Sequence, residues 1–163
     1  SNQMNLMDID ENYTFMQSSA YHLKWMEMYY PSLFEDIKKR VQEGRYEPNG
    51  GAYVESDGNI PGGEYLIRQF LWGMNYTREK FGYSSNAFFL PDSFGFSAAL
   101  PQILQGCEIP YFLTTKVGWN DTNMFPYDTF YWEGIDGSQV LTHFNCTEGG
   151  TTEMPDSPDL CSR

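Results

Sequence analysis

One acidic residue of this sequence, Asp92, stands where α/β proteins keep the groups that do chemistry. It follows the apolar run at residues 87–90 and precedes a turn and helix start, the segment SFGFS at residues 93–97. When a strand ends in an acid and is followed by a helix and a second strand, the acid lies at the carboxyl edge of a parallel sheet. A carboxylate at this edge is suited to act as a nucleophile or as a metal ligand. We therefore build the functional prediction on Asp92.

The strands predicted before and after residues 87–90 also end in charged residues. Glu55, with Asp57 just beyond it, ends the strand predicted before Asp92, and Lys116 ends the strand predicted after it. Neighbouring strands lie about 4.8 Å apart, so the three ends can meet in one patch. A Lys116 ammonium within reach of Asp92 would hold the carboxylate ionised, as a nucleophile or metal ligand requires. The alternative is a surface ion pair, which contributes little to stability.

Other side chains that could do chemistry have ordinary structural alternatives. His22 falls in a predicted helix, where we expect a surface or core histidine. His143 falls in a predicted strand, where a structural role is favoured over metal binding. Trp119 heads the polar loop at residues 119–123, on the edge expected to carry the site. Such a combination is found in sugar sites, but also in ordinary Asx-turn loops.

Composition narrows the possible partners. The chain has 163 residues, enough for one domain with a core, and a net charge of −12. The acidic balance disfavours nucleic acid and anionic membrane surfaces, and no apolar run is long enough to span a bilayer. The 17% aromatic content suits stacking on sugars, although core packing explains most aromatic residues. Three widely spaced cysteines without a CxxC pair favour a reduced, cytoplasmic setting.

The elements that position these residues alternate between helix and strand. Helical patterns predict helices at residues 15–30, 31–44 and 64–81 and a short helix that Ser97 opens and Gly106 ends. Strands are predicted at residues 50–55, 87–90, 111–115, 130–133 and 139–144, the last two joined by a hairpin turn. The strand–helix–strand unit around Asp92 predicts parallel pairing. The fold class is therefore α/β.

Several ordered segments resemble the α-mannosidases of glycoside hydrolase family 38. The segment LPDSFGFSAALPQI at residues 90–103 is similar to the family's nucleophile segment. The flanking blocks agree with its neighbours along the chain: GGAYVESDGN (50–59), RQFL (68–71), YFLTTK (111–116), WNDTN (119–123) and WEGIDG (132–137). The resemblance runs from about Phe15 to Phe144 and is greatest to the bacterial and cytosolic branch.

The resemblance implies a retaining hydrolysis of α-mannosides, acting on mannose-containing oligosaccharides. The aspartate that matches Asp92 is both the catalytic nucleophile and a ligand of a divalent metal, usually Zn²⁺. The position that matches Lys116 is basic and beside the nucleophile. Phe94 matches an aromatic wall of the mannose subsite, Asp57 an acidic position near the site, and Trp119 a substrate contact. The implied fold is the family's seven-stranded β/α barrel with parallel strands, of which this chain supplies an incomplete part.

Other family features are missing from these residues. The metal site of the family also uses a His-x-Asp pair and a further histidine, and the general acid comes from later sequence. We therefore expect a fragment of the catalytic domain over residues 1–146, inactive alone, followed by a polar loop or frayed end at 147–163. An incomplete barrel would associate with its missing parts or with a second copy. Two alternatives remain: a non-catalytic carbohydrate-binding fragment, and a metal-dependent carbohydrate deacetylase on a similar barrel.

Overall fold

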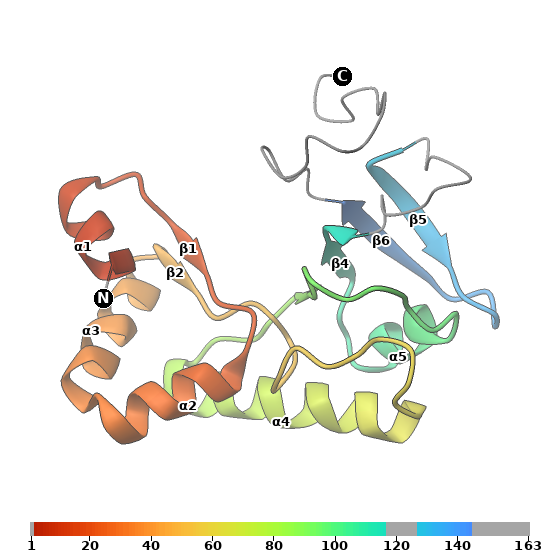
Figure 1. Cartoon of the computed structure of the whole chain (residues 1–163), viewed down its shortest axis with the longest axis horizontal. Coiled ribbons are helices and arrows are strands. Elements are labelled where there is room, and N and C mark those ends of the chain that lie inside the picture. The colour runs from red at the N-terminus through yellow and green to blue at the C-terminus, as the bar shows by residue number, and fades with distance from the viewer. Residues whose placement is uncertain (1, 117–126, 145–163) are drawn as a thin grey trace.

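A computed structural model describes residues 2–116 and 127–144 of the chain and shows a mixed α/β fold with mostly parallel strands (Figure 1). In chain order the elements are α1 (Asn2–Ile9), β1 (Phe15–Met16), α2 (Ala20–Tyr29), α3 (Pro31–Gln42), β2 (Tyr46–Glu47), α4 (Gly63–Phe81), β3 (Ala87–Phe89), α5 (Leu100–Gly106), β4 (Tyr111–Thr114), β5 (Thr129–Glu133) and β6 (Gln139–Phe144). None of the helices in these two stretches is both long enough and apolar enough to cross a membrane.

The larger sheet has four strands in the order β3-β4-β6-β5. β3 and β4 pair in parallel, with Phe88 opposite Phe112, which confirms the predicted strand–helix–strand unit. β4 and β6 are also parallel, whereas β5 and β6 form the predicted antiparallel hairpin. Because β3, β4 and β6 run the same way, their carboxyl ends share one edge of the sheet. The described strands do not close into a barrel, so the barrel itself stays a prediction.

Aromatic side chains pack the core between this sheet and α4. The rings of Phe70 on α4 and Phe88 on β3 meet edge to face, with centroids 4.8 Å apart. Phe88 also lies against Phe112 of β4, at 5.5 Å. All three side chains are almost completely buried. Because the two central strands are fixed to α4 through these rings, the ends of those strands have a rigid base.

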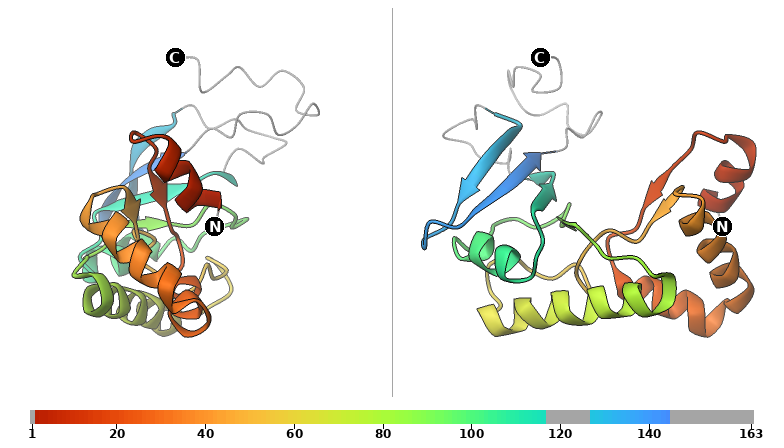
Figure 2. Two further views of the ribbon diagram at one scale, coloured as in Figure 1. Left: turned by 90° about the vertical axis from the view of Figure 1, so that its left-hand side faces the viewer. Right: turned by 180° about the vertical axis from the view of Figure 1, so that it is seen from behind.

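The helix α4 links the two halves of the molecule. It runs along one side from the four-stranded sheet to the N-terminal helices, as the view from behind shows (Figure 2). One face buries Leu66, Phe70 and Thr77, as the predicted stripe requires. The helix ends at Gly82, whose φ of +66° is the left-handed conformation that glycine adopts at helix ends. The prediction of this helix is confirmed to within a residue at its start.

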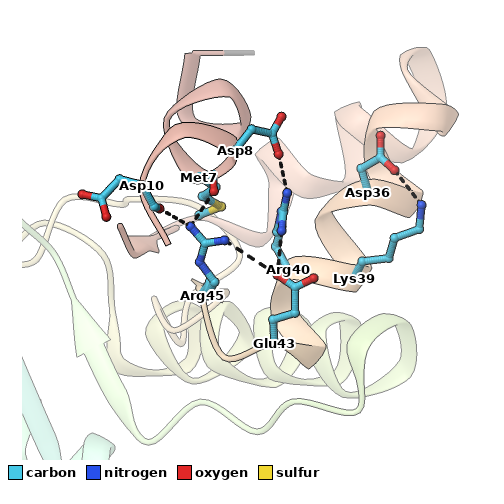
Figure 3. A network of polar contacts seen from close by, with 8 residues as sticks. All are labelled: Met7, Asp8, Asp10, Asp36, Lys39, Arg40, Glu43 and Arg45. Atoms are coloured by element: carbon cyan, nitrogen blue, oxygen red, sulfur yellow. Dashed lines mark hydrogen bonds and ion pairs between the residues drawn. The ribbon is translucent and has the colours of Figure 1, made fainter. Parts of the chain in front are cut away.

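Two arginines, Arg40 in the last turn of α3 and Arg45 just beyond that helix, bind α1 and the residue that follows it. Arg45 donates hydrogen bonds to the main-chain carbonyls of Met7, at 2.7 Å, and Asp10 (Figure 3). Arg40 forms ion pairs with Asp8 and with Glu43. Together with a second apolar cluster, which includes Leu23, Phe34 and Ile37, these contacts hold the N-terminal helices as one packed unit.

Two sequence predictions are wrong and three elements were missed. The helix predicted at residues 15–30 starts only at Ala20, because Phe15 and Met16 pair with β2 instead. No strand forms at residues 50–55: Gly51 has a φ of +75°, and Gly50 passes so close to Ser18 that a side chain would overlap its carbonyl. The segment still lies beside β3, since Phe89 N–H donates to the Gly50 carbonyl at 3.2 Å. The helix α1 and the short strands β1 and β2 were not predicted.

Candidate active site

Asp92 lies just beyond the carboxyl end of β3, as the sequence predicts. Ala87, Phe88 and Leu90 are buried and Phe89 is half-buried, and the chain then turns through Pro91 into solvent. The side chain of Asp92 is 70% exposed. The exposed carboxylate of Asp92 therefore lies at the shared edge of the sheet, directly after a largely buried strand.

Lys116, just beyond the end of the adjacent strand β4, reaches this carboxylate. Its Nζ lies 3.1 Å from Oδ1 of Asp92, and its own side chain is only 23% exposed. The proximity expected from two neighbouring strand ends is confirmed. An exposed ion pair of this kind is worth about 0–1 kcal/mol of stability. Its consequence is local: the ammonium restrains where the neighbouring carboxylate points.

Phe94 adds an exposed aromatic ring to the pair. Its side chain is 70% exposed, and the ammonium of Lys116 lies 6.0 Å from the ring centre, within the range of a cation–π interaction. Phe96, two positions on, points the other way and packs edge to face on Phe112, with centroids 5.1 Å apart. The anchored Phe96 fixes the turn, so Asp92, Lys116 and the Phe94 ring stay together on one surface.

The Asp57 segment docks against this turn. The N–H of Gly58 donates to Oγ of Ser93 at 3.2 Å, and the N–H of Ser97 donates to the carbonyl of Gly58 at 2.9 Å. Gly58 has no room for a side chain, because a Cβ would come within 2.8 Å of the Gly95 carbonyl. Asp57 is thus held on a loop in direct contact with the loop of Asp92.

The carboxylate of Asp57 is engaged within its own turn. Its Oδ1 accepts hydrogen bonds from the N–H groups of Ile60 at 2.7 Å and Asn59 at 2.8 Å. These bonds favour the ionised form and lower the pKa of Asp57 below its ordinary value. Asp57 therefore brings a second negative charge to the neighbourhood of Asp92.

The remaining candidates lie elsewhere or outside the described residues. Glu55 does not end a strand, since none forms there, and its carboxylate accepts a hydrogen bond from Ser18. The ring of His143 lies 2.8 Å from the hydroxyl of Thr129 across the β5–β6 hairpin, and His22 contacts Gln17 at 3.2 Å. Trp119 and its loop lie outside the described residues.

The described residues alone do not fit a complete metal site. Nowhere in residues 2–116 and 127–144 do three or more His, Cys, Asp or Glu side chains gather closely enough to hold an ion. At the candidate site Asp92 supplies one carboxylate, and Lys116 already sits against it. Asp92 can offer a single ligand, and a full set would need donors from other residues.

Sequence reasoning missed the small residues that organise this surface. Ser93 is 7% exposed, and its hydroxyl accepts from Gly58 and donates to the Gly95 carbonyl at 3.2 Å. Gly58 is recognisable from the sequence only as part of a turn. The available sequence signal was the cluster of small residues around Asp57 and around Asp92. Such clusters are typical of closely packed loops, but they do not indicate which loops contact each other.

Comparison with known proteins points to one family. The sequence model of the family described as glycosyl hydrolases family 38 N-terminal domain matches residues 1–157 of this chain. Alpha-mannosidase G of Dictyostelium discoideum is 49% identical over 144 residues, which are 88% of this chain and 13% of that protein. Alpha-mannosidase 2C1 of Mus musculus is 47% identical over 144 residues, again 88% of this chain and 14% of the relative. The chain thus spans about one seventh of the length of these relatives.

A solved structure agrees with this result at the level of the fold. A crystal structure of an alpha-mannosidase from Enterococcus faecalis V583 superposes with a TM-score of 0.74. The two chains are 23% identical, and the match covers 88% of this chain and 16% of the other. At that identity the likeness concerns the fold alone.

Proposed function

Since this chain belongs to the glycosyl hydrolases family 38 N-terminal domain family, we propose that it carries the nucleophile of a retaining α-mannosidase. The observation that carries the proposal is the position of Asp92, an exposed carboxylate at the end of a buried parallel strand, 3.1 Å from Lys116. Parallel α/β folds use that edge for catalysis. The substrates would be oligosaccharides with terminal α-mannosyl residues, and the fold would form part of the family's barrel.

Asp92 would act on the anomeric carbon of the mannosyl residue. A carboxylate oxygen forms a bond to C1 while the bond from C1 to the leaving oxygen breaks, and a general acid outside these residues protonates the leaving group. The product is a mannosyl ester of Asp92, which water then hydrolyses by attack at C1, regenerating the carboxylate. Two displacements at the same carbon retain its configuration.

The neighbouring side chains have distinct proposed roles. Lys116, in contact with the carboxylate, keeps Asp92 oriented before attack. Phe94, exposed at the turn, offers a flat apolar face on which the sugar ring can stack. Asp57, and Trp119 on its loop, are proposed to contact substrate hydroxyls or the ring, roles that rest on the family resemblance.

A metal site at Asp92 would need further ligands from other residues. The family resemblance implies that Asp92 is also a ligand of a divalent ion such as Zn²⁺, but the described residues supply only this one carboxylate at the site. We therefore base no reaction step on a metal. The cytoplasmic setting, the association with further barrel parts or a second copy, and the division at residue 146 stay predictions.

The two alternative functions have less support. A carbohydrate deacetylase needs a compact set of Asp and His ligands, and no such set occurs within the described stretches. A non-catalytic carbohydrate-binding fragment would use the aromatic surface without needing Asp92. Family membership favours the hydrolase over both.

Hydrolysis of an aryl α-mannoside tests the proposal. The assay uses the complete native polypeptide that contains this sequence, with Asp92→Asn as the variant and Asp36→Asn, an exposed change on α3, as the control. We expect Asp92→Asn to lower kcat by more than about a thousandfold, since the nucleophile is lost, and the control to retain activity. Full activity in Asp92→Asn would refute the assignment, and mannoside binding without hydrolysis by any form would favour the binding fragment.

A further inference from the structure

Backbone pairing between β3 and β4 ends at Leu90, two residues before Asp92. The N–H of Leu90 donates to the carbonyl of Leu113 at 3.0 Å. The next residue is Pro91, which has no N–H and cannot continue the ladder. From this point other groups must fix the chain that leads into Asp92.

Beyond the last backbone hydrogen bond of the ladder, two consecutive threonine hydroxyls bind the main chain of the β3 side. Oγ1 of Thr114 donates to the carbonyl of Leu90 at 2.7 Å, and Oγ1 of Thr115 donates to the carbonyl of Pro91. Thr114 is completely buried, and Thr115 is half-buried. The two carbonyls they hold belong to the two residues directly before Asp92, so the peptide plane that joins Pro91 to Asp92 is itself hydrogen-bonded.

The residue after Asp92 is fixed as well. The buried hydroxyl of Ser93 accepts from Gly58 and donates to the Gly95 carbonyl, each at 3.2 Å. The main chain of Asp92 is thus held on both sides, while its carboxylate is exposed and meets Lys116. A rigid backbone under an accessible side chain is the arrangement that a group needs when it must approach a reacting atom in one direction.

We infer that Thr114 and Thr115 are positioning residues that set the direction in which the Asp92 carboxylate points. The inference rests on the proposed role of Asp92 as a nucleophile. The threonines touch no substrate and act through the carbonyls of Leu90 and Pro91. Lys116 follows them directly in the chain, so the same short segment fixes the backbone of Asp92 and supplies the ammonium beside its carboxylate.

Valine and serine variants separate this role from general stabilisation. Thr114→Val and Thr115→Val keep the shape of the side chain but remove the hydroxyl, whereas Thr114→Ser and Thr115→Ser keep the hydroxyl. Thr77→Val is the matched control, because the buried hydroxyl of Thr77 also donates to a main-chain carbonyl, that of Met74 at 3.1 Å, but on α4. All variants are made in the complete native polypeptide that contains this sequence.

The first measurement is steady-state hydrolysis of an aryl α-mannoside. We expect each valine variant to lower kcat by about 10- to 100-fold, since misplacing a reacting group by about 1 Å costs that much, while KM changes by less than about threefold. The serine variants should recover most of kcat, and Thr77→Val should leave both constants unchanged. Equal kcat in wild type and Thr115→Val would overturn the inference while leaving the proposed function intact.

The second measurement does not depend on activity. Hydrogen–deuterium exchange is followed by mass spectrometry in peptides that cover residues 90–97. We expect about tenfold faster exchange there in Thr115→Val, with other peptides unchanged, because only the local opening equilibrium shifts. If the wild type hydrolyses no α-mannoside, the proposed function fails, and this exchange alone decides whether the threonines position Asp92. Unchanged exchange, or unfolding of both valine variants, would reduce the threonines to an ordinary structural role and overturn the inference.

Discussion

The ammonium of Lys116 lies 3.1 Å from the carboxylate of Asp92, and the two residues follow the ends of adjacent parallel strands. The contact joins segments that are separated in the chain by the whole of α5. It occurs because β3 and β4 pair in register and end at the same edge of the sheet. The same ammonium lies 6.0 Å from the ring centre of Phe94, so one cation faces both an acid and an aromatic surface.

This relationship predicts that Lys116→Gln affects activity far more than stability. The free energy of unfolding should change by no more than about 1 kcal/mol, because the pair is exposed on the Asp92 side. The value of kcat/KM for an aryl α-mannoside should fall by at least about tenfold, which corresponds to about 1.4 kcal/mol of transition-state stabilisation. Urea unfolding and steady-state kinetics measure the two effects. Lys39→Gln, which breaks the exposed pair with Asp36, is the control and should leave kinetics unchanged; equal activity of the two variants would contradict the role of Lys116.

Phe94→Ala should weaken substrate binding without destabilising the protein. The side chain is 70% exposed, so its removal should change the free energy of unfolding by less than about 0.5 kcal/mol. Loss of the stacking surface should raise KM for the mannoside several-fold. Phe94→Tyr, which keeps an aromatic ring, should return KM to the wild-type value. Tyr65→Ala, which removes an equally exposed ring on α4, should leave KM as in the wild type. A KM that is unaffected by Phe94→Ala would remove Phe94 from the sugar site.

Gly58→Ala should open the contact between the loops of Asp57 and Asp92. The new Cβ would come within 2.8 Å of the Gly95 carbonyl and 2.9 Å of the Phe96 ring. Overpacking of this kind costs about 1–3 kcal/mol, which urea unfolding would detect. Gly106→Ala is the matched control, since a Cβ there meets nothing within 4 Å. If Gly58→Ala proves as stable as Gly106→Ala, the two loops do not dock as described.

The stability contributed by Asp57 should depend on pH in a defined direction. Hydrogen bonds from Ile60 and Asn59 lower the pKa of Asp57 in the folded protein below its unfolded value of about 3.9. The contribution is therefore fully present above the unfolded pKa and is lost as the pH falls through the folded pKa. Comparison of wild type with Asp57→Asn in urea should show a difference that is largest above about pH 5 and shrinks below about pH 4. A difference that stays constant across this range would contradict the assignment of these hydrogen bonds.

Strong local patterns account for what the sequence predicted correctly. The helix over residues 64–81 has a continuous apolar stripe and a glycine at its end, and the apolar runs at 87–90 and 111–115 are bounded by turn residues. Adjacent parallel strands then made the meeting of Asp92 and Lys116 predictable. In each of these places local propensity and tertiary structure agree.

The failures arise where distant contacts decide the local conformation. Residues 15 and 16 leave the helical pattern because β2 offers them backbone partners, which no local signal announces. Residues 50–55 look like a strand, but the close approach of Gly50 to Ser18 bends the chain. The hydroxyls of Ser93 and Thr115 were missed for a related reason. Serine and threonine are common in turns and strands, and only the folded structure shows that these two hold the backbone around Asp92.

Trapping of the covalent intermediate identifies the nucleophile of the reaction directly. An activated fluorinated α-mannoside, which slows hydrolysis of the mannosyl ester, is incubated with the complete native polypeptide that contains this sequence, and peptides are analysed by mass spectrometry. We expect a fluoromannosyl adduct on the carboxylate of Asp92, absent from Asp92→Asn and retained in the Asp36→Asn control. An adduct on a different carboxylate of an active enzyme, or hydrolysis with inversion at C1, would contradict the assignment of Asp92 as the nucleophile.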